Sequence, residues 1–232
     1  MTLPFFYSKD ILQAGGLVSL EADTSKHIAQ VLRMQSGDQL QLTDGQGHLV
    51  LAELTDNHKN HCQARIVRSL PVAARARKVV MAVSLLKQPA RYEWFLEKAT
   101  EIGVDEIIPL VCTRTEKQHF KNERWQGILI SAMLQSRQSN LPVLSEPVSF
   151  ASLMQRDLLP NRFIGYCGDE FEKKPLQVTS AGDCMMLIGP EGDFTEEEIK
   201  LAVSKGFQPV TLGLNRLRTE TAAMLSCVLL NQ

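Results

Sequence analysis

The stretch that decides the fold is Met185-Met186-Leu187-Ile188-Gly189-Pro190-Glu191-Gly192-Asp193-Phe194-Thr195. It begins with four apolar residues, as a strand does when a parallel sheet is covered on both faces. The two glycines that follow permit a tight turn and close approach of a ligand to the backbone. Thr195 and Glu198 then form a capping box, which opens a helix that stops at Gly206. This order predicts an open α/β sheet with a ligand crevice at the turn.

The same alternation of strands and helices extends outward from this stretch. Further apolar runs predict strands at residues 79–86, 107–111, 162–166 and 209–212. Helical patterns occupy residues 89–103, 123–138 and 219–230. The last of these helices is almost entirely apolar after Glu220, so we expect it to be buried against the sheet or a partner chain.

The residues before the basic stretch Arg75-Ala76-Arg77-Lys78 have a different pattern of apolar and polar side chains. Alternating runs at residues 39–43 and 48–54 flank the turn Asp44-Gly45-Gln46-Gly47 and predict a hairpin, and residues 63–68 predict a further strand. One helix interrupts these strands, with Thr24 as its cap and a buried stripe made of Ile28, Val31 and Leu32. We therefore expect a small β-barrel domain at residues 1–72 and an α/β domain at residues 73–232.

Composition narrows the function classes. The chain of 232 residues has 25 basic and 26 acidic residues, so any RNA-binding surface must come from local clusters of cations. Five dispersed cysteines and the spacing of the histidines indicate neither a disulfide framework nor a metal site. Neither a signal peptide nor a membrane span is recognisable, and we expect a soluble cytoplasmic protein.

The charges at the glycine turn indicate the class of ligand. Glu191, Asp193 and residues 196–198 surround the helix N-terminus with negative charge, which disfavours a phosphate and favours a neutral or cationic ligand. The nucleotide motifs GxxxxGK[ST] and GxGxxG are absent from this stretch, which argues against nucleoside triphosphates and NAD. A glycine turn that binds no ligand stays open as the alternative.

Two other segments carry charges that call for partners. Arg218 stands just before a helix, where a cation opposes the macrodipole, so a carboxylate or a ligand should compensate it. Glu220 could be that carboxylate, although ordinary capping would also explain its position. Lys87 and Arg91 place two cations on the connection after the first strand of the second domain, and solvation at the surface is the simpler explanation for both.

Together these segments resemble the ribosomal RNA small subunit methyltransferase E family, which belongs to the SPOUT class of methyltransferases. The resemblance covers almost the whole chain. It is carried by Gly189-Pro190-Glu191-Gly192, by Leu212-Gly213 with Leu217-Arg218-Thr219-Glu220-Thr221-Ala222, by Glu93-Trp94 with Lys98-Ala99-Thr100-Glu101-Ile102-Gly103-Val104, by Ile107-Ile108-Pro109, and by Val31-Leu32-Arg33 with Gly37-Asp38.

The resemblance implies a fold, a cofactor and a reaction. A PUA-like RNA-binding β-barrel would precede a SPOUT-type parallel-sheet domain with a trefoil knot. S-adenosyl-L-methionine would be the cofactor, wrapped by the loops at residues 188–192 and 212–221. The product would be N3-methyluridine in small-subunit (16S) ribosomal RNA. The protein would be a homodimer that acts on this RNA or on the assembled small subunit.

The resemblance also implies roles for individual residues. The expected catalytic residues are Arg218, which would stabilise charge on the uridine, and Glu220, which would orient it. The expected cofactor contacts are Leu187, Ile188, Gly189, Glu191, Gly192, Leu212, Gly213, Leu217, Thr219, Thr221 and Ala222. Independently of the resemblance, the near-zero net charge means that local cations must bind RNA, and the candidates are Arg33, Arg65 and Arg68 in the barrel and Lys87, Arg91, Arg114 and Lys117 in the second domain.

The chain departs from the family pattern at four positions. Ser131 and Leu134 stand where acidic residues are common, and Leu214 and Asn215 replace a proline and an arginine, with Arg216 able to supply the cation one position later. Two other functions stay open: a sibling SPOUT enzyme that methylates another base atom or a ribose hydroxyl, and a non-catalytic ribosome-assembly factor.

Overall fold

The computed structural model describes residues 3–10, 14–117, 119–178 and 182–232. The chain forms two compact units, one made of Met1–Ala74 with Met133–Leu141, the other of Arg75–Ala132 with Pro142–Gln232. Met133–Leu141, which a boundary at residue 72 assigns to the second domain, therefore groups with the first unit. Hydrogen bonds explain this, because Leu141 N–H donates to Gly45 O (2.7 Å) and Thr43 Oγ1 donates to Ser139 O (3.1 Å).

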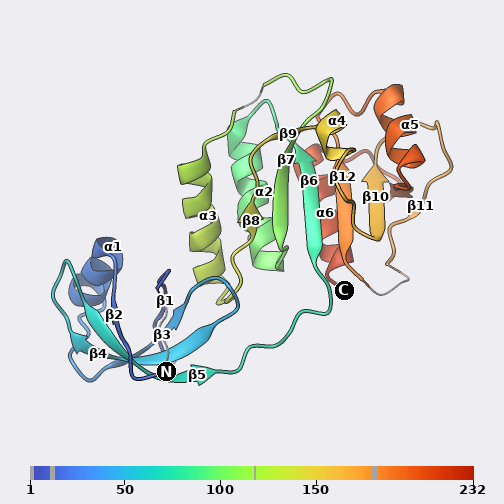
Figure 1. The fold of residues 1–232 in the computed structure, drawn as a ribbon. Helices are drawn as coiled ribbons and strands as arrows, with labels where there is room; N and C mark the ends of the chain where they lie inside the picture. Colours follow the sequence, from blue (N-terminus) through green and yellow to red (C-terminus); the bar gives the residue numbers. More distant parts are fainter. Residues whose placement is uncertain (1–2, 11–13, 118, 179–181) are drawn as a thin grey trace. The chain divides into compact units, whose positions relative to one another are not determined.

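The first unit contains a five-stranded sheet in the order β1-β3-β4-β5-β2 (Figure 1). Its β3 and β4 form the predicted antiparallel hairpin, whereas β1 runs parallel to β3. Side chains that alternate along these strands, such as Leu40, Leu42 and Val50, are buried in one apolar core. The strands are β1 (Phe5–Tyr7), β2 (Leu17–Ser19), β3 (Gln39–Thr43), β4 (Leu49–Asp56) and β5 (Gln63–Leu70).

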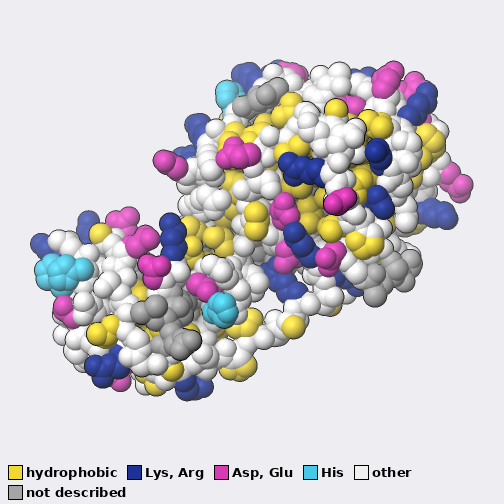
Figure 2. Space-filling model, in the orientation of Figure 1, with side chains coloured by type: hydrophobic (Ala, Val, Ile, Leu, Met, Phe, Trp, Pro, Cys, Tyr) yellow, Lys and Arg dark blue, Asp and Glu magenta, His cyan; other side chains and the backbone are white. Residues whose placement is uncertain are grey.

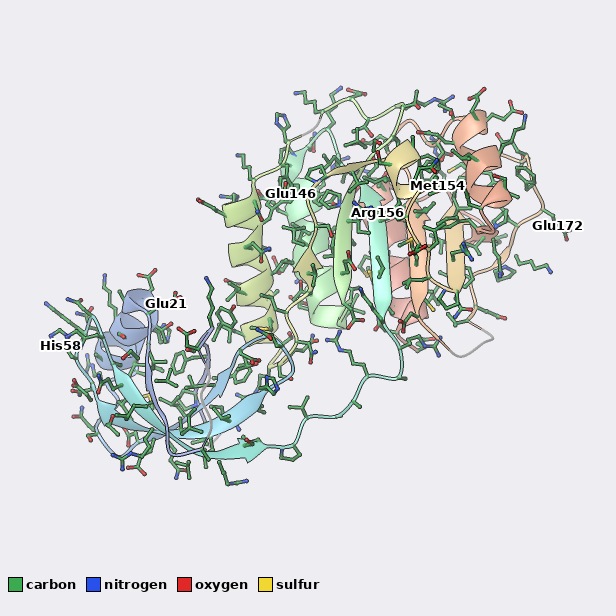
Figure 3. All side chains as sticks on the ribbon, viewed as in Figure 1. Glu21, His58, Glu146, Met154, Arg156 and Glu172 are labelled. Atoms are coloured by element: carbon green, nitrogen blue, oxygen red, sulfur yellow. The ribbon has the colours of Figure 1, made fainter. Side chains whose placement is uncertain are left out.

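The helix of this unit differs from the prediction. It begins as α1 (Ala22–Lys26) and continues as a π-helical segment, η1 (His27–Val31). Glu21 immediately precedes α1 (Figure 3), and Thr24 lies inside the helix instead of capping it. Of the expected buried stripe, Ile28 is buried, but Val31 is 66% exposed and Leu32 42% exposed. A π-turn has more residues than an α-turn, so the i, i+3, i+4 spacing no longer marks one face.

The second unit is built on a parallel sheet in the order β11-β13-β10-β12-β6-β7-β8, with β9 paired to β7. Every residue of β6 and β12 is buried, as the apolar runs predicted for strands covered on both sides. The strands are β6 (Val79–Ser84), β7 (Glu106–Val111), β8 (Val143–Leu144), β9 (Val148–Ser149), β10 (Asn161–Gly165), β11 (Lys174–Pro175), β12 (Cys184–Ile188) and β13 (Gln208–Thr211).

Helices cover both faces of this sheet. On one face α6 packs against β6, β12 and α2. The other face joins a core that includes Val80, Leu187, Leu153 of α4 and Ile199 of α5. The helices are α2 (Pro89–Ile102), α3 (Asn122–Gln135), α4 (Phe150–Leu153), α5 (Glu196–Ser204) and α6 (Thr219–Leu230).

Two helix ends deserve comparison with the predictions. The C-cap of α2 is Gly103 in the left-handed conformation (φ 101°), as its position after the apolar stripe predicted. By contrast α3 ends at Gln135, three residues before the predicted end at Gln138. Among the described residues, no helix is long and apolar enough to cross a membrane.

Basic and acidic side chains are interspersed over the face drawn in Figure 2, as the near-zero net charge predicts. This face therefore gives no broad electrostatic attraction for RNA.

Candidate functional site

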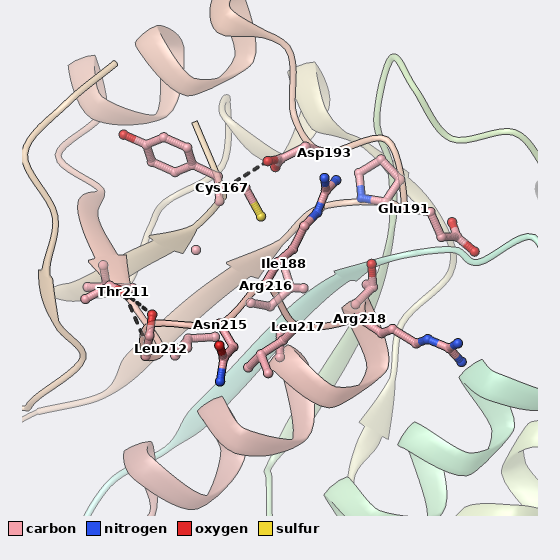
Figure 4. A pocket seen from close by; sticks show the side chains of 18 of the residues that line it. Cys167, Ile188, Glu191, Asp193, Thr211, Leu212, Asn215, Arg216, Leu217 and Arg218 are labelled. Carbon is pink, nitrogen blue, oxygen red and sulfur yellow. Dashed lines mark hydrogen bonds between the residues drawn. The ribbon is translucent and has the colours of Figure 1, made fainter. Parts of the chain in front are cut away.

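Strands β10, β12 and β13 are parallel neighbours, so their carboxyl ends meet at one edge of the sheet. A cavity of about 630 Å³ opens there (Figure 4). Its wall consists of residues 165–167, 188–191 and 210–219, with Arg91, Lys173, Asp193 and Ala222. The carboxyl edge of a parallel sheet is where the glycine turn predicted a ligand crevice.

Hydrogen bonds hold the loop after β12 in one conformation. Asp193 has a left-handed backbone (φ 64°), and its N–H donates to Pro190 O (2.9 Å). Its carboxylate accepts from the N–H groups of Cys167 and Phe194, both at 2.8 Å. Thr195 and Glu198 close the predicted capping box at the start of α5. Asp193 thereby ties the loop after β12 to the chain leaving β10.

The two glycines of this loop have different surroundings. A Cβ added to Gly189 would lie 3.0 Å from the Phe194 ring and 3.2 Å from its backbone nitrogen, closer than ordinary contact. At Gly192 the nearest atom would be Cβ of Arg114, at 3.4 Å. Arg114 Nη1 also donates to Gly192 O (2.8 Å). Gly189 is thus part of the cavity wall and tightly packed, whereas Gly192 faces Arg114.

The loop after β13 forms the opposite wall. Thr211 Oγ1 donates to Gly213 O (3.0 Å) and accepts from Gly213 N–H (3.3 Å), which closes the turn at its start. Gly213 has φ 133°, and a Cβ there would meet no protein atom within 4 Å. In Figure 4 the side chain of Arg216 runs toward Asp193, while that of Arg218 points away from it. Neither guanidinium has a hydrogen bond or ion pair with any residue that the structure describes.

The third wall, after β10, was not predicted from the sequence. Tyr166 and Cys167 line it, and Lys173 Nζ donates to both their carbonyls, at 3.4 and 3.3 Å, while lying 4.8 Å from the centre of the Tyr166 ring. Cys167 is exposed, yet desolvation by the surrounding protein, followed by the charge of Asp193, raises the pKa of its thiol. The thiol is therefore protonated at neutral pH. One signal in the sequence could have revealed this wall. Residues 162–166 were predicted as a strand of a parallel sheet, and the carboxyl ends of neighbouring parallel strands meet at one edge.

Glu220 faces a different partner from the expected one. Its Oε1 lies 3.7 Å from Nε of Arg91, and no ion pair joins it to Arg218 in the described part of the chain. Glu220 is only 8% exposed and is not among the residues that line the cavity. Since α2 packs against α6, the first turn of α2 brings Arg91 to the first turn of α6, a proximity that no local spacing reveals.

Most of the expected cofactor contacts share the cavity wall, namely Ile188, Gly189, Glu191, Leu212, Gly213, Leu217, Thr219 and Ala222. Three lie outside it: Leu187 in the apolar core, Gly192 against Arg114, and Thr221 on α6. Arg218 and Arg91 line the cavity as well. Pro190, Asp193, Asn215 and Arg216 belong to the wall but were not among the expected contacts.

The other cations expected to bind RNA are dispersed. Arg33, Arg65 and Arg68 are exposed in the first unit, and Arg33 has a left-handed backbone (φ 53°). In the second unit Lys87 Nζ pairs with Glu116 (2.8 Å), Arg114 is bonded to the loop after β12, and Lys117 is exposed. Within the described ranges no cluster of His, Cys, Asp and Glu could hold a metal ion.

The charged side chains of the cavity wall differ in whether the described protein already provides a partner for them. Asp193 and Lys173 are engaged by backbone groups, and Glu191 accepts from Lys87 N–H (3.1 Å). Arg216 and Arg218 are left without protein partners among the residues described, which suits them to anionic groups of a ligand. No histidine lines the cavity, so its wall offers no imidazole base.

Comparison with known proteins is consistent across sequence and structure. Residues 74–231 match the model of an RNA methyltransferase domain, and residues 20–67 match that of an RNA methyltransferase PUA domain. Ribosomal RNA small subunit methyltransferase E of Rickettsia conorii is 28% identical over 94% of this chain and 91% of its own. The protein of the same name from Bacillus subtilis is 27% identical over 94% of this chain and 90% of its own.

Solved structures agree with these relatives. A probable rRNA methyltransferase from Porphyromonas gingivalis has a TM-score of 0.87 and 36% identity, covering 97% of this chain and 95% of that one. The Neisseria gonorrhoeae ribosomal RNA small subunit methyltransferase E, solved bound to S-adenosyl methionine, has a TM-score of 0.87 and 29% identity with the same coverage. The chain belongs to the ribosomal RNA small subunit methyltransferase E family.

Proposed function

We propose that this protein transfers the methyl group of S-adenosyl-L-methionine to N3 of a uridine in small-subunit (16S) ribosomal RNA, and that it does so as a homodimer in the cytoplasm. The observation that carries the proposal is the cavity at the ends of β10, β12 and β13, whose wall contains eight of the residues expected to contact this cofactor. The trefoil knot of these strands stays a prediction from the family resemblance.

The cavity wall fits the chemical groups of the cofactor. Ile188, Leu212 and Leu217 supply apolar surface for an adenine ring, and the backbone around Gly213 is open for polar contacts with its edge. Glu191 and Asp193 offset the positive charge of a sulfonium. When bound, the cofactor supplies a methyl group on a positively charged sulfur that is a good leaving group.

The chain's own residues position the uridine and stabilise its charge. N3 must lose its proton, and negative charge then spreads to the neighbouring oxygens O2 and O4. Arg218, which lines the cavity without a protein partner in the described chain, is suited to stabilise that charge in the transition state. No histidine is among the described residues of the wall, so solvent or a group of the partner chain takes the proton. Because N3 lies on the pairing edge, the uridine must be unpaired when it enters.

RNA affinity depends on cations outside the cavity. Arg33, Arg65 and Arg68 in the first unit would contact phosphates, together with exposed cations of the second unit such as Lys117. Each such contact releases counterions, so RNA binding should weaken steeply as salt is raised. A fragment that begins near Arg75 should retain cofactor binding and lose most RNA affinity.

The homodimer is supported by one face of α6. Met224, Leu225, Val228 and Leu229 are only partly buried within the chain. A two-fold dimer buries the same patch of both subunits, and such interfaces are largely apolar, as this face of α6 is. Light scattering at micromolar protein should therefore report a dimer, and an active monomer would contradict this part of the proposal.

Nucleoside analysis tests the reaction. Small subunits from cells that lack this protein would be incubated with the purified enzyme and S-adenosyl-L-methionine, and their 16S RNA digested for mass spectrometry. We expect N3-methyluridine to appear only when enzyme and cofactor are both present. A different methylated nucleoside would favour a sibling SPOUT activity. Absence of both methylation and cofactor binding would favour a non-catalytic assembly factor.

A further inference from the structure

The contact between Arg91 and Glu220 joins the first turns of two helices beside the cavity. Arg91 is the third residue of α2, and Glu220 is the second residue of α6. Arg91 lines the cavity, whereas Glu220 is 8% exposed and is not part of the wall. The arginine therefore lines the cavity, and the carboxylate that it approaches does not.

The ion pair between Arg91 and Glu220 contains no hydrogen bond. For comparison, Glu93 of α2 forms a hydrogen-bonded ion pair with Arg124 of α3. Arg124 Nε and Nη2 donate to the two carboxylate oxygens of Glu93 at 2.7 and 2.8 Å. Between Arg91 and Glu220 the only close approach is 3.7 Å, which is too long for a hydrogen bond. Glu220 Oε2 is buried and has no hydrogen-bond partner among the described residues.

An ion pair that contains no hydrogen bond contributes little to the stability of the fold. A buried carboxylate oxygen without a donor loses its hydration and gains no hydrogen bond in return, which destabilises the fold. Arg91 also sits at a helix N-terminus, where the macrodipole repels a cation. Most of the guanidinium donors have no protein acceptor in the described chain, so they remain available to a ligand in the cavity.

We propose that Arg91 is a second substrate-contacting cation and that Glu220 is its positioning residue. The inference rests on the proposed methylation at uridine N3. Loss of the N3 proton to water leaves charge on two oxygens, O2 and O4, that flank N3. The N3 electron pair then bonds to the methyl carbon, and the carbon–sulfur electron pair returns to sulfur. The guanidinium groups of Arg91 and Arg218 would each stabilise the charge on one of these two oxygens.

Kinetics of variants at saturating RNA and cofactor test this role. Removing one preorganised donor from a developing negative charge costs about 100-fold in turnover, and we expect this for Arg91→Gln. Glu220→Gln keeps the shape of the side chain but releases Arg91, and we expect about a tenfold loss. Both substitutions remove the same positioned guanidinium from the substrate. The double variant should therefore be no slower than Arg91→Gln alone. Affinities for S-adenosylhomocysteine and RNA should stay within about twofold.

A pH profile separates a charge role from a structural one. A cation near O2 or O4 favours loss of the N3 proton, so the rate should rise to its plateau at higher pH in Arg91→Gln than in the wild type. Arg91→Lys, which keeps the charge without the planar fork, should restore part of the rate and of the profile. Arg124→Gln breaks the hydrogen-bonded pair between Arg124 of α3 and Glu93 of α2 and serves as the matched control, with unchanged rate and profile.

Several results would overturn the inference. Additive losses in the double variant would show that Glu220 does not act through Arg91. Weaker RNA binding and a shallower salt dependence, with unchanged saturated rate, would make Arg91 a phosphate contact. If Arg91→Gln fails to fold, a wild-type profile in Glu220→Gln and Arg91→Lys would also refute it. Absence of N3-methyluridine with the wild type would instead refute the proposed function itself.

Discussion

The loops after β12 and β13 face each other across the cavity and are built in opposite ways. Asp193 binds two backbone N–H groups, and Gly189 packs against Phe194, so the loop after β12 is held by the protein alone. The loop after β13 presents Arg216 and Arg218, whose side chains have no partner in the described chain. The first loop is preorganised for binding, and the second carries charge that a ligand must balance.

The largest effect should come from the second loop. Arg218→Gln should lower turnover by about 100-fold to 1,000-fold, because it removes a cation from the developing charge on the uridine. The melting temperature and the affinity for S-adenosylhomocysteine should change little, since Arg218 has no described protein partner to lose. Turnover close to that of the wild type would remove Arg218 from the site and break the contrast between the loops.

Asp193→Ala should show the complementary pattern in the first loop. The variant loses two charge-assisted hydrogen bonds, and we expect a loss of about 2–4 kcal/mol in stability. Cofactor affinity should fall with it, because the loops after β10 and β12 are no longer tied together. Denaturant unfolding and calorimetry measure the two effects. A stable variant with wild-type affinity would mean that the tie is not needed.

A matched pair of glycine variants sharpens the account of the first loop. Gly189→Ala forces Cβ against Phe194 at 3.0 Å, whereas Gly192→Ala meets Arg114 at 3.4 Å. We expect Gly189→Ala to cost about 1–3 kcal/mol and to weaken cofactor binding, as overpacked sites do. Gly192→Ala should stay within about 0.5 kcal/mol of the wild type. Equal effects on cofactor affinity would show that Gly192 also approaches the ligand.

The smallest effect concerns the thiol of Cys167 in the third wall. Since burial and Asp193 raise its pKa, the thiolate is scarce at neutral pH, and its alkylation by iodoacetamide should be slow there and accelerate as pH rises. S-adenosylhomocysteine should slow the reaction by occupying the cavity. Mass spectrometry of the labelled peptide gives the rate. Fast labelling at pH 7 that the ligand does not slow would place the thiol outside the ligand site.

Local signals predicted much of this fold and half of the site. The glycine turn, the Thr195 capping box and the apolar strands follow from interactions within a few residues, and all appear in the structure. The wall at Tyr166 and Cys167 depends on which strands are neighbours. The partner of Glu220 depends on α2 packing against α6. Such proximities arise between segments far apart in sequence and leave no periodic pattern.

The prediction for the π-helical segment was wrong for a different reason. Its residues are spaced as an α-helical stripe requires, yet Val31 and Leu32 are exposed. Only Ile28 enters the core of the first unit. Leu32 N–H donates to His27 O (3.0 Å), an i→i−5 hydrogen bond of the kind that defines a π-turn. Apolar spacing alone cannot distinguish an α-turn from a π-turn.

A crystal structure with S-adenosylhomocysteine tests the central claim most directly, namely that the cofactor fills the cavity between the two loops and leaves Arg218 available to the substrate. We predict that the ligand occupies the cavity at the ends of β10, β12 and β13, that residues 188–193 keep their present conformation, and that the Arg218 guanidinium does not contact the ligand. A ligand bound elsewhere, or one whose carboxylate pairs with Arg218, would contradict the account.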